Sequence, residues 1–196
     1  MLTTTDKLST DGALSHNVST DGTVRIWPYE SGAYGRDALY RVWKLMEDDQ
    51  ATKACFWDEA HYESGADLCS FIQSFEGVKD KQLLMIERCD TGLLCGCFWI
   101  GQIRLNHQAF VSMWMQQSAR GPMSGAAAQI ALQYTFRRWN LRQVFAMTPW
   151  AIAGTLCRMM GFTRIAVMPE FCQWTDGTFL PVSLYRLTKE GVRWAD

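Results

Sequence analysis

The sequence carries almost no net charge. Its 196 residues hold 19 Lys and Arg against 20 Asp and Glu, which gives a formal net charge of -1. This balance gives no electrostatic support for general nucleic-acid binding, so nucleic acid is not an expected partner. Arg137, Arg138 and Arg142 nevertheless form a local basic group.

The sequence also lacks clustered metal ligands and long apolar runs. Its seven cysteines include no Cys-x-x-Cys pair, and no further ligand follows closely on Cys95 and Cys97, so no metal site is expected. Reduced, mostly buried thiols in a cytosolic protein explain them more simply. No stretch reaches the roughly 20 apolar residues that span a bilayer. The start of the chain, with Asp6 and Lys7, does not read as a signal peptide. These features predict a soluble, cytoplasmic protein without a membrane partner.

The composition indicates a globular chain, because hydrophobic residues make up 48% of it. We expect a polar N-terminal extension over residues 1–22 and one domain over residues 23–196. Ser-Thr-Asp-Gly occurs twice in the extension, which is too few copies for a repeat architecture. The extension is either a flexible tail or a segment packed on its own domain or on a neighbouring subunit, which leaves a homo-oligomer open.

Periodicity and turn signals predict an α/β (α+β) domain whose elements follow the order β-α-α-β-β-β-α-β-α-β-β. Helices are expected on both faces of one sheet. The predicted strands cover residues 23–29, 82–87, 93–105, 109–116, 143–147, 163–168 and 179–188, and the predicted helices cover 36–49, 66–75, 124–139 and 148–161. A loop is expected over residues 169–177.

A glycine-containing turn, Arg120–Gly125, separates the strand over 109–116 from the helix over 124–139. A turn of this kind presents backbone N–H groups at the positive end of a helix dipole, which is a seat for an anion such as phosphate. Ser124 is a plausible N-cap of this helix.

This element order and this turn resemble the GCN5-related N-acetyltransferase family, over roughly residues 23–189. The family's turn runs Gln/Arg-x-x-Gly-x-Gly/Ala, and here Arg120–Gly125 reads Arg-Gly-Pro-Met-Ser-Gly, with Met123 at the position of the first glycine. The family's next helix often reads Asn-x-x-Ala-x-x-Leu-Tyr-x-x-x-Gly-Phe. The run from Trp150 to Phe162 matches its Ala, Leu, Gly and Phe, but it has Trp150 for the Asn and Cys157 for the Tyr.

The resemblance implies a GNAT-like, mixed and mostly antiparallel central sheet, with acetyl-CoA as co-substrate and an amine-bearing acceptor. The N–H groups of the turn would hold the pyrophosphate, the Met115 backbone would hold the thioester carbonyl, and Gln117 would lie near the pantetheine arm. The residues that it assigns to acetyl-CoA binding are Met115, Gln117, Arg120, Gly121, Ser124, Gly125 and Ala126.

The chemistry requires a neutral amine and a proton for the departing thiolate. Cys157 replaces the tyrosine that commonly supplies this proton in the family, although a small buried core residue is the simpler interpretation of it. Glu87 and His107 are candidate bases, and each is also read as an ordinary strand or turn residue. Trp57, Glu59 and His61 form a suspected acceptor-binding lip or, equally, an aromatic plug between helices. Glu170 lies on the expected loop before the last strand, which often closes the acceptor pocket in this family.

Two functions remain open from the sequence. The first is an acetyl-CoA-dependent N-acetyltransferase in which the amine attacks the thioester directly. The second is a catalytically degenerate GNAT-like domain that serves as an assembly or interaction protein, as in some bacteriophage virion components. The shape of the gap between the strands over 109–116 and 143–147 discriminates between them, because a side chain filling that gap excludes catalysis.

Overall fold

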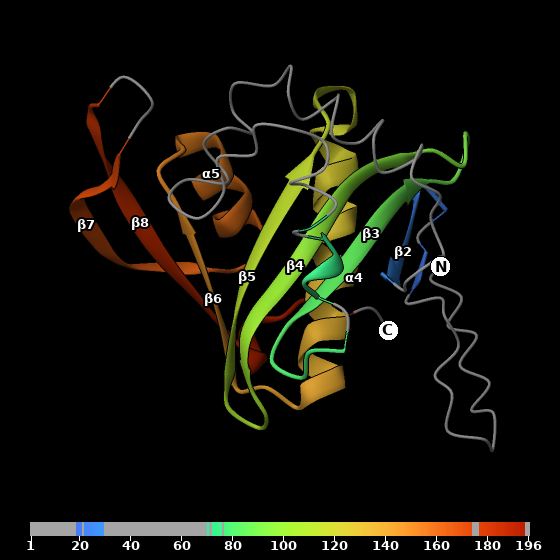
Figure 1. Cartoon of the computed structure of the whole chain (residues 1–196), viewed down its shortest axis with the longest axis horizontal. Helices are drawn as coiled ribbons and strands as arrows, with labels where there is room; N and C mark the ends of the chain where they lie inside the picture. Colours follow the sequence, from blue (N-terminus) through green and yellow to red (C-terminus); the bar gives the residue numbers. More distant parts are fainter. Residues whose placement is uncertain are drawn as a thin grey trace.

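The computed structural model describes residues 19–20, 22–29, 70, 72–75, 77–173 and 177–194. These residues build one eight-stranded sheet with the strand order β1-β2-β3-β4-β5-β6-β8-β7 (Figure 1). Every neighbouring pair is antiparallel except β5 and β6, which run parallel. The strands are β1 (Ser19–Thr20), β2 (Val24–Pro28), β3 (Gln82–Arg88), β4 (Leu94–Arg104), β5 (Gln108–Met115), β6 (Gln143–Thr148), β7 (Thr163–Gln173) and β8 (Phe179–Thr188).

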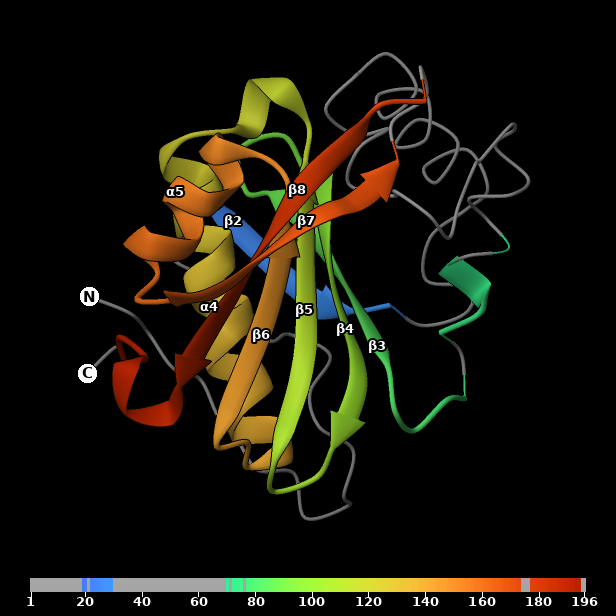
Figure 2. The same cartoon turned by 90° about the vertical axis from the view of Figure 1, so that its left-hand side faces the viewer.

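Two α-helices, α4 (Pro122–Trp139) and α5 (Ala151–Met159), lie on the same side of the sheet (Figure 2). Short 3-10 helices precede α4 (η1, Gln117–Ala119) and follow β8 (η2, Lys189–Gly191). The larger core includes buried residues of α4 together with Leu84 and Ile86 of β3. Leu83 and Met85 belong to a second cluster, with Ile72. The unbroken apolar run of β3 is therefore explained by burial on both faces.

Most of the predicted elements are confirmed within a residue or two. The mixed and mostly antiparallel sheet is also confirmed. The helix over 36–49 and most of the one over 66–75 lie outside the described residues, as does nearly all of the extension over 1–22.

The loop expected over residues 169–177 was wrong in its first half, because β7 continues to Gln173. Its register against β8 shifts between Met168 and Cys172, so the strand passes Pro169 through an irregularity. Pro181 lies in the part of β8 that pairs with β7 but not with β6, whose pairing starts at Ser183. Among the described strands, β8 therefore has a partner on one side only at Pro181, an edge position of the kind that tolerates proline.

The boundaries of α4 follow from local chemistry. Gly121 is its N-cap and Pro122 its first residue. An N–H group at this first position has no acceptor within the helix, so a proline there loses no hydrogen bond. The expectation that Ser124 is the N-cap was wrong: it lies inside the helix, and its hydroxyl donates to the Ala119 carbonyl at 3.3 Å. Asn140 ends the helix in the left-handed conformation, with φ 48° and ψ 47°, which asparagine tolerates better than most residues.

Main-chain bonds join the turns at the lower end of the sheet in Figure 1. The Asn106 N–H donates to the Trp139 carbonyl at 3.0 Å, which ties the β4–β5 turn to the end of α4. The N–H groups of Arg142 and Gln143 donate to the His107 carbonyl, and the Lys189 N–H donates to the Arg142 carbonyl. The starts of β5 and β6 and the end of β8 are therefore fixed to one another. Among the helices described, none is both long and apolar enough to cross a membrane.

Candidate active site

Strands β5 and β6 separate as they leave this lower end. Their pairing covers Gln108–Phe110 against Gln143–Phe145 and then stops, although β5 continues to Met115 and β6 to Thr148. Beyond Phe110 the two strands therefore enclose a V-shaped gap.

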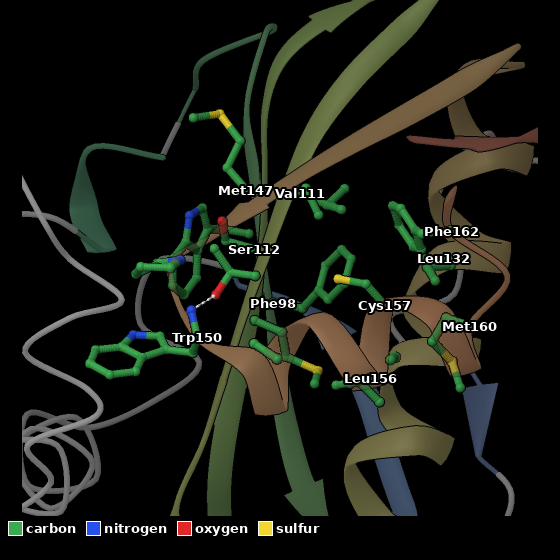
Figure 3. Close-up of a pocket in the computed structure, with 17 residues that line it drawn as sticks. Phe98, Val111, Ser112, Leu132, Met147, Trp150, Leu156, Cys157, Met160 and Phe162 are labelled. Atoms are coloured by element: carbon green, nitrogen blue, oxygen red, sulfur yellow. Dashed lines mark hydrogen bonds between the residues drawn. The ribbon is translucent and has the colours of Figure 1, made fainter. Parts of the chain in front are cut away.

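An open cavity of about 110 Å³ occupies this gap. Cys157, Leu132 and Phe162 lie on one side of it, and Ser112, Met147 and Trp150 lie on the other (Figure 3). The cavity walls come from β4, β5, β6, α4 and α5, and no described wall residue carries a charged side chain. None of the described side chains that line the gap fills it, so they leave room for a ligand between them.

Backbone groups of β5 face the gap. The Gln116 N–H donates to the Cys95 carbonyl of β4 at 2.8 Å. Because successive strand residues direct their N–H and C=O groups to opposite sides, Val111, Met113 and Met115 direct theirs away from β4 and toward the gap. Met113 and Val111 also line the cavity. The gap thus has N–H donors along one wall.

The turn after β5 holds the start of α4 near the open end of the gap. Gly121 has φ 91° and ψ −132°, a conformation that is essentially restricted to glycine. The first N–H groups of α4 have no intrahelical acceptor, and the N-cap residue, a glycine, has no side chain to cap them. Arg120 braces the turn, since its Nε donates to the Met115 carbonyl at 3.1 Å.

This geometry shows what the departure at Met123 does to the turn. Met123 is an ordinary residue of the first helical turn, and the glycine requirement falls on Gly121 instead. Gly125 is also helical, and its N–H already donates to the Gly121 carbonyl at 3.2 Å. The donors left for an anion are therefore the N–H groups of Gly121, Met123 and Ser124, because Pro122 has none.

Helix α5 brings Cys157 to the cavity, as its alignment with the family's tyrosine implies. Burial raises the pKa of the Cys157 thiol to about 11, against a smaller lowering by Arg158. The thiol is therefore protonated at neutral pH. Trp150 caps the start of α5 with extended backbone, and its N–H donates to the Thr148 hydroxyl at 3.0 Å.

The two candidate bases, Glu87 and His107, and the predicted acceptor-pocket residue Glu170 do not line the cavity. Glu87 lies on β3 with its Oε1 3.9 Å from Arg25 Nη1, and burial raises the pKa of its carboxyl while Arg25 lowers it in part. His107 is an exposed residue of the β4–β5 turn, at the opposite end of β5 from the Gly121 turn. Glu170 is an exposed residue of β7 with φ 50°. None of these three is among the cavity residues.

Three residues of the suspected acceptor-binding lip, Trp57, Glu59 and His61, lie outside the described residues. Gln117 is an exposed residue of η1, and Ala126 lies in the first turns of α4. Among the described residues, no group of three or more His, Cys, Asp or Glu side chains could hold a metal ion.

Sequence reasoning missed most walls of the cavity, including the apolar residues Phe98, Leu132 and Met147 and the polar Ser112. Nothing in their local pattern distinguishes them from core residues of a strand or helix. Only the divergence of β5 from β6 turns them into cavity walls. Trp150 was noted only as a departure from the family's asparagine.

Comparison with known proteins supports the fold and not a specific activity. No family model matches the sequence, and no curated protein matches it. Among solved structures, spermidine N-acetyltransferase from Vibrio cholerae, in complex with CoA and spermine, superposes with a TM-score of 0.72 at 17% identity. That match covers 87% of this chain and 98% of the other.

Two further structures are similar over comparable lengths. RimL, a ribosomal L7/L12 alpha-N-protein acetyltransferase in complex with coenzyme A, gives a TM-score of 0.73 at 14% identity and covers 89% of this chain and 99% of its own. Mycobacterium smegmatis RimJ, in complex with CoA-disulfide, gives 0.70 at 16% identity, with 88% and 85% covered. Likeness at these identities establishes architecture, and the chain accordingly has the fold of the GCN5-related N-acetyltransferases.

Proposed function

We propose that this protein is an N-acyltransferase that moves a short acyl group, in the first place acetyl, from CoA to an amine. The observation that carries the proposal is the open cavity between β5 and β6, whose β5 wall leads along the chain into the glycine-dependent turn that starts α4. An acyl-CoA needs both an anion seat for its pyrophosphate and a narrow slot for its thioester end. The three solved structures that contain CoA in the same fold support this interpretation.

The anion seat in this proposal consists of the N–H groups of Gly121, Met123 and Ser124. They lie at the positive end of an 18-residue helix whose first turn contains no acidic side chain. Both features favour a bound anion. Arg120 shapes the seat through its bond to the Met115 carbonyl. Gly125 lies one residue beyond the seat and has room for a side chain, because an added Cβ there would meet only Met160, at 4.0 Å.

The reaction proceeds by attack of the amine nitrogen on the thioester carbonyl carbon. The C–S bond breaks, the nitrogen loses a proton and the CoA thiolate gains one. The N–H groups of Met113 and Met115 face the gap and are the donors we assign to the developing negative charge on the carbonyl oxygen. Fixed backbone donors of this kind need no reorganisation during the reaction.

Cys157 contacts the thioester end in this proposal but is a poor proton donor. A thiol with a pKa of about 11 is a weaker acid than an unperturbed cysteine thiol, whose pKa is about 8.5. Transfer of its proton to the departing thiolate is therefore unfavourable. Its position beside Leu156 and Met160 fits a wall residue of the slot.

The apolar walls also bear on the acceptor. Trp150, Met147 and Trp99 surround the approach with apolar surface, which lowers the pKa of an entering ammonium group and favours the neutral, nucleophilic amine. A peptide α-amino group, with a pKa of about 7.7–8.0, loses its proton far more readily than an alkylamine near 10.4. An α-amino acceptor, as named for RimL, therefore fits this cavity better than a polycation such as spermidine, as named for the Vibrio cholerae enzyme.

The alternative, a degenerate domain that acts only in assembly, draws on the departures from the family's motifs at Met123, Trp150 and Cys157. The open cavity favours the acyl-transfer proposal, which requires such a space, and the three structures compared above are acetyltransferases.

The test uses two alanines of one helix that differ in what they face. Ala153 lines the cavity, whereas Ala151, two residues earlier on α5, is exposed and does not. Acetyl-CoA binding is measured by calorimetry for the parent protein, Ala153→Phe and Ala151→Phe. Transfer to an unblocked peptide and to spermidine is then followed by release of free thiol.

We expect Ala153→Phe to weaken acetyl-CoA binding at least about tenfold, because the new ring occupies the slot, and Ala151→Phe to leave it unchanged. The absence of binding heat in the parent at millimolar acetyl-CoA contradicts the proposal. Equal effects of the two substitutions contradict the assignment of the cavity. Faster transfer to spermidine than to the peptide overturns the acceptor class alone.

A further inference from the structure

Basic side chains gather at the end of the molecule opposite the Gly121 turn. From residue 70 onward Lys and Arg outnumber Asp and Glu, whereas Asp and Glu outnumber Lys and Arg before residue 70. The net charge of -1 is therefore the sum of an acidic first part and a basic second part of the chain. The exposed cations at this end, which we call the basic end, are Lys79, Arg104, Arg137, Arg138, Arg142 and Lys189. They come from four separate segments of the chain.

Hydrogen bonds between these segments fix them as one surface. The Ile103 N–H donates to the Asp80 carbonyl at 2.8 Å, which joins the turn before β3 to the end of β4. Lys189 Nζ donates to Asn140 Oδ1 at 3.1 Å, and Asn140 Nδ2 donates to Asn106 Oδ1. Figure 1 shows the C-terminal end of α4, the β4–β5 turn and the turn before β3 together at the lower end of the molecule. The basic end therefore belongs to the rigid sheet and not to independent loops.

The cations of the basic end are available to an anionic partner. Both ion pairs found among the described residues lie elsewhere, at Arg25–Glu87 and Arg88–Asp90. Arg137 stacks over the Trp194 ring at 5.1 Å from its centroid, which leaves its charge uncompensated. Asp80 and Glu190 are the carboxylates that the described residues contribute nearby, and both are exposed.

A groove of about 520 Å³ opens at the same end. Tyr29, Phe75 and Trp139 contribute aromatic walls, and Lys79 and Arg138 contribute cations. Lys81 also lines it, with its Nζ 5.2 Å from the centre of the Phe75 ring. Aromatic rings alternate with positive charges here, which is the arrangement that stacks bases and neutralises phosphates.

We propose that the basic end binds single-stranded nucleic acid, with phosphates along Arg137, Arg138 and Arg142 and a base in the aromatic groove. Charge alone would equally attract an acidic protein, but the three aromatic walls favour flat bases over carboxylate side chains. This proposal is independent of the acyl-transfer proposal, because β5 separates the basic end from the Gly121 turn by roughly 23 Å at about 3.3 Å per residue.

The experiment measures binding of a fluorescein-labelled oligouridine of about 15 nucleotides, a length that spans a typical single-strand site. Anisotropy is followed at several salt concentrations for the full-length protein and two triple variants. Arg137→Gln with Arg138→Gln and Arg142→Gln removes charge from the basic end. Arg158→Gln with Arg164→Gln and Arg186→Gln removes the same charge from exposed positions on α5, β7 and β8.

We expect the basic-end variant to lose at least about tenfold in affinity at 0.1 M salt and its log–log salt slope to fall by about 2, since each lost phosphate contact on a single strand contributes roughly 0.7. The control variant changes affinity less than about threefold, and acetyl-CoA binding is the same in both. Absence of binding at low salt, or equal losses in the two variants, overturns the proposal. Equal competition by an oligoglutamate peptide also overturns it, in favour of an acidic protein partner.

Discussion

The two ends of the β5–β6 pair differ in how their backbone groups are used. At the lower end the strands are joined. There the main-chain or side-chain groups of three turn residues form hydrogen bonds with neighbouring segments; these residues are His107, Asn140 and Arg142. At the upper end the strands have separated, and the N–H groups of Val111 and Met113, both of which line the cavity, face it instead of a strand. One pair of strands thus has a bonded end and an open end.

This difference separates stability from binding within one sheet. Backbone hydrogen bonds at the bonded end are satisfied within the protein, so changes there are expected to alter the free energy of unfolding. At the open end, backbone donors are left for a ligand, so changes there are expected to alter affinity. Substitutions at each end can test whether the two properties are in fact separable.

The largest effect is expected at the open end, from Gly121→Ala. An alanine at φ 91° and ψ −132° is strained by about 1–3 kcal/mol. An added Cβ would meet nothing within 4 Å, so the strain is conformational and not steric contact. The turn relieves it by moving its N–H groups. We expect acetyl-CoA affinity to fall by roughly 10- to 100-fold in calorimetry.

Gly125→Ala is the matched control for this substitution. Gly125 lies in the helix with room for a Cβ, and alanine favours a helix over glycine by roughly 1 kcal/mol. Affinity should stay within about threefold and the melting temperature should not fall. A loss of affinity as large for Gly125→Ala as for Gly121→Ala would show that the turn's backbone conformation is not what holds the ligand.

At the bonded end, Asn140→Ala is expected to lower the stability of the fold and leave acetyl-CoA affinity unchanged. Asn140 holds the left-handed conformation and bonds Asn106 and Lys189 through its side chain. Loss of these features is expected to cost about 1–2 kcal/mol of unfolding free energy. Acetyl-CoA affinity should be unchanged, because the site lies at the far end of β5. Urea denaturation measures the first quantity and calorimetry the second.

Asn140→Gly separates the two contributions, since glycine keeps the left-handed conformation and loses only the side-chain bonds. Its cost should be smaller than that of alanine. A large fall in acetyl-CoA affinity for either variant would mean that the two ends of the sheet are coupled.

The sequence predicted the described elements of the sheet well because their signals are local. The alternating, β-rich segment over residues 23–29 and the short break between the strands over 82–87 and 93–105 are each set by a few neighbouring residues. The end of β7 was missed for the same reason. Pro169 is a strong local signal for a loop, but β7 continues beyond it because Cys172 and Gln173 pair with β8, a strand further along the chain, after a register shift.

The candidate site was predictable only where it is local. The turn was found, but the position that needs glycine was not, because a one-dimensional motif does not contain φ values: Gly121 carries the positive φ and Met123 does not. The cavity depends on where β5 and β6 stop pairing, which is a property of two strands separated by a whole helix. Glu87 and His107 were chosen for their chemistry, and the topology places neither on the cavity wall.

Cys157→Ser is expected to give the smallest effect, and it tests how the open end works. A thiol whose pKa lies near 11 stays protonated from pH 6 to pH 9, so Cys157 does not titrate in that range. Suppose that backbone donors and the apolar walls make the main contributions to catalysis. The rate of acetyl transfer should then change less than about threefold, and its pH profile over this range should keep its shape. If the thiol instead protonates the departing thiolate, kcat should fall by about 100-fold or more, as is usual for loss of a general acid, with the affinity for acetyl-CoA unchanged. A kcat-selective loss would therefore assign a chemical role to Cys157, whereas a small and uniform change would leave the open end as a site built from backbone groups and shape.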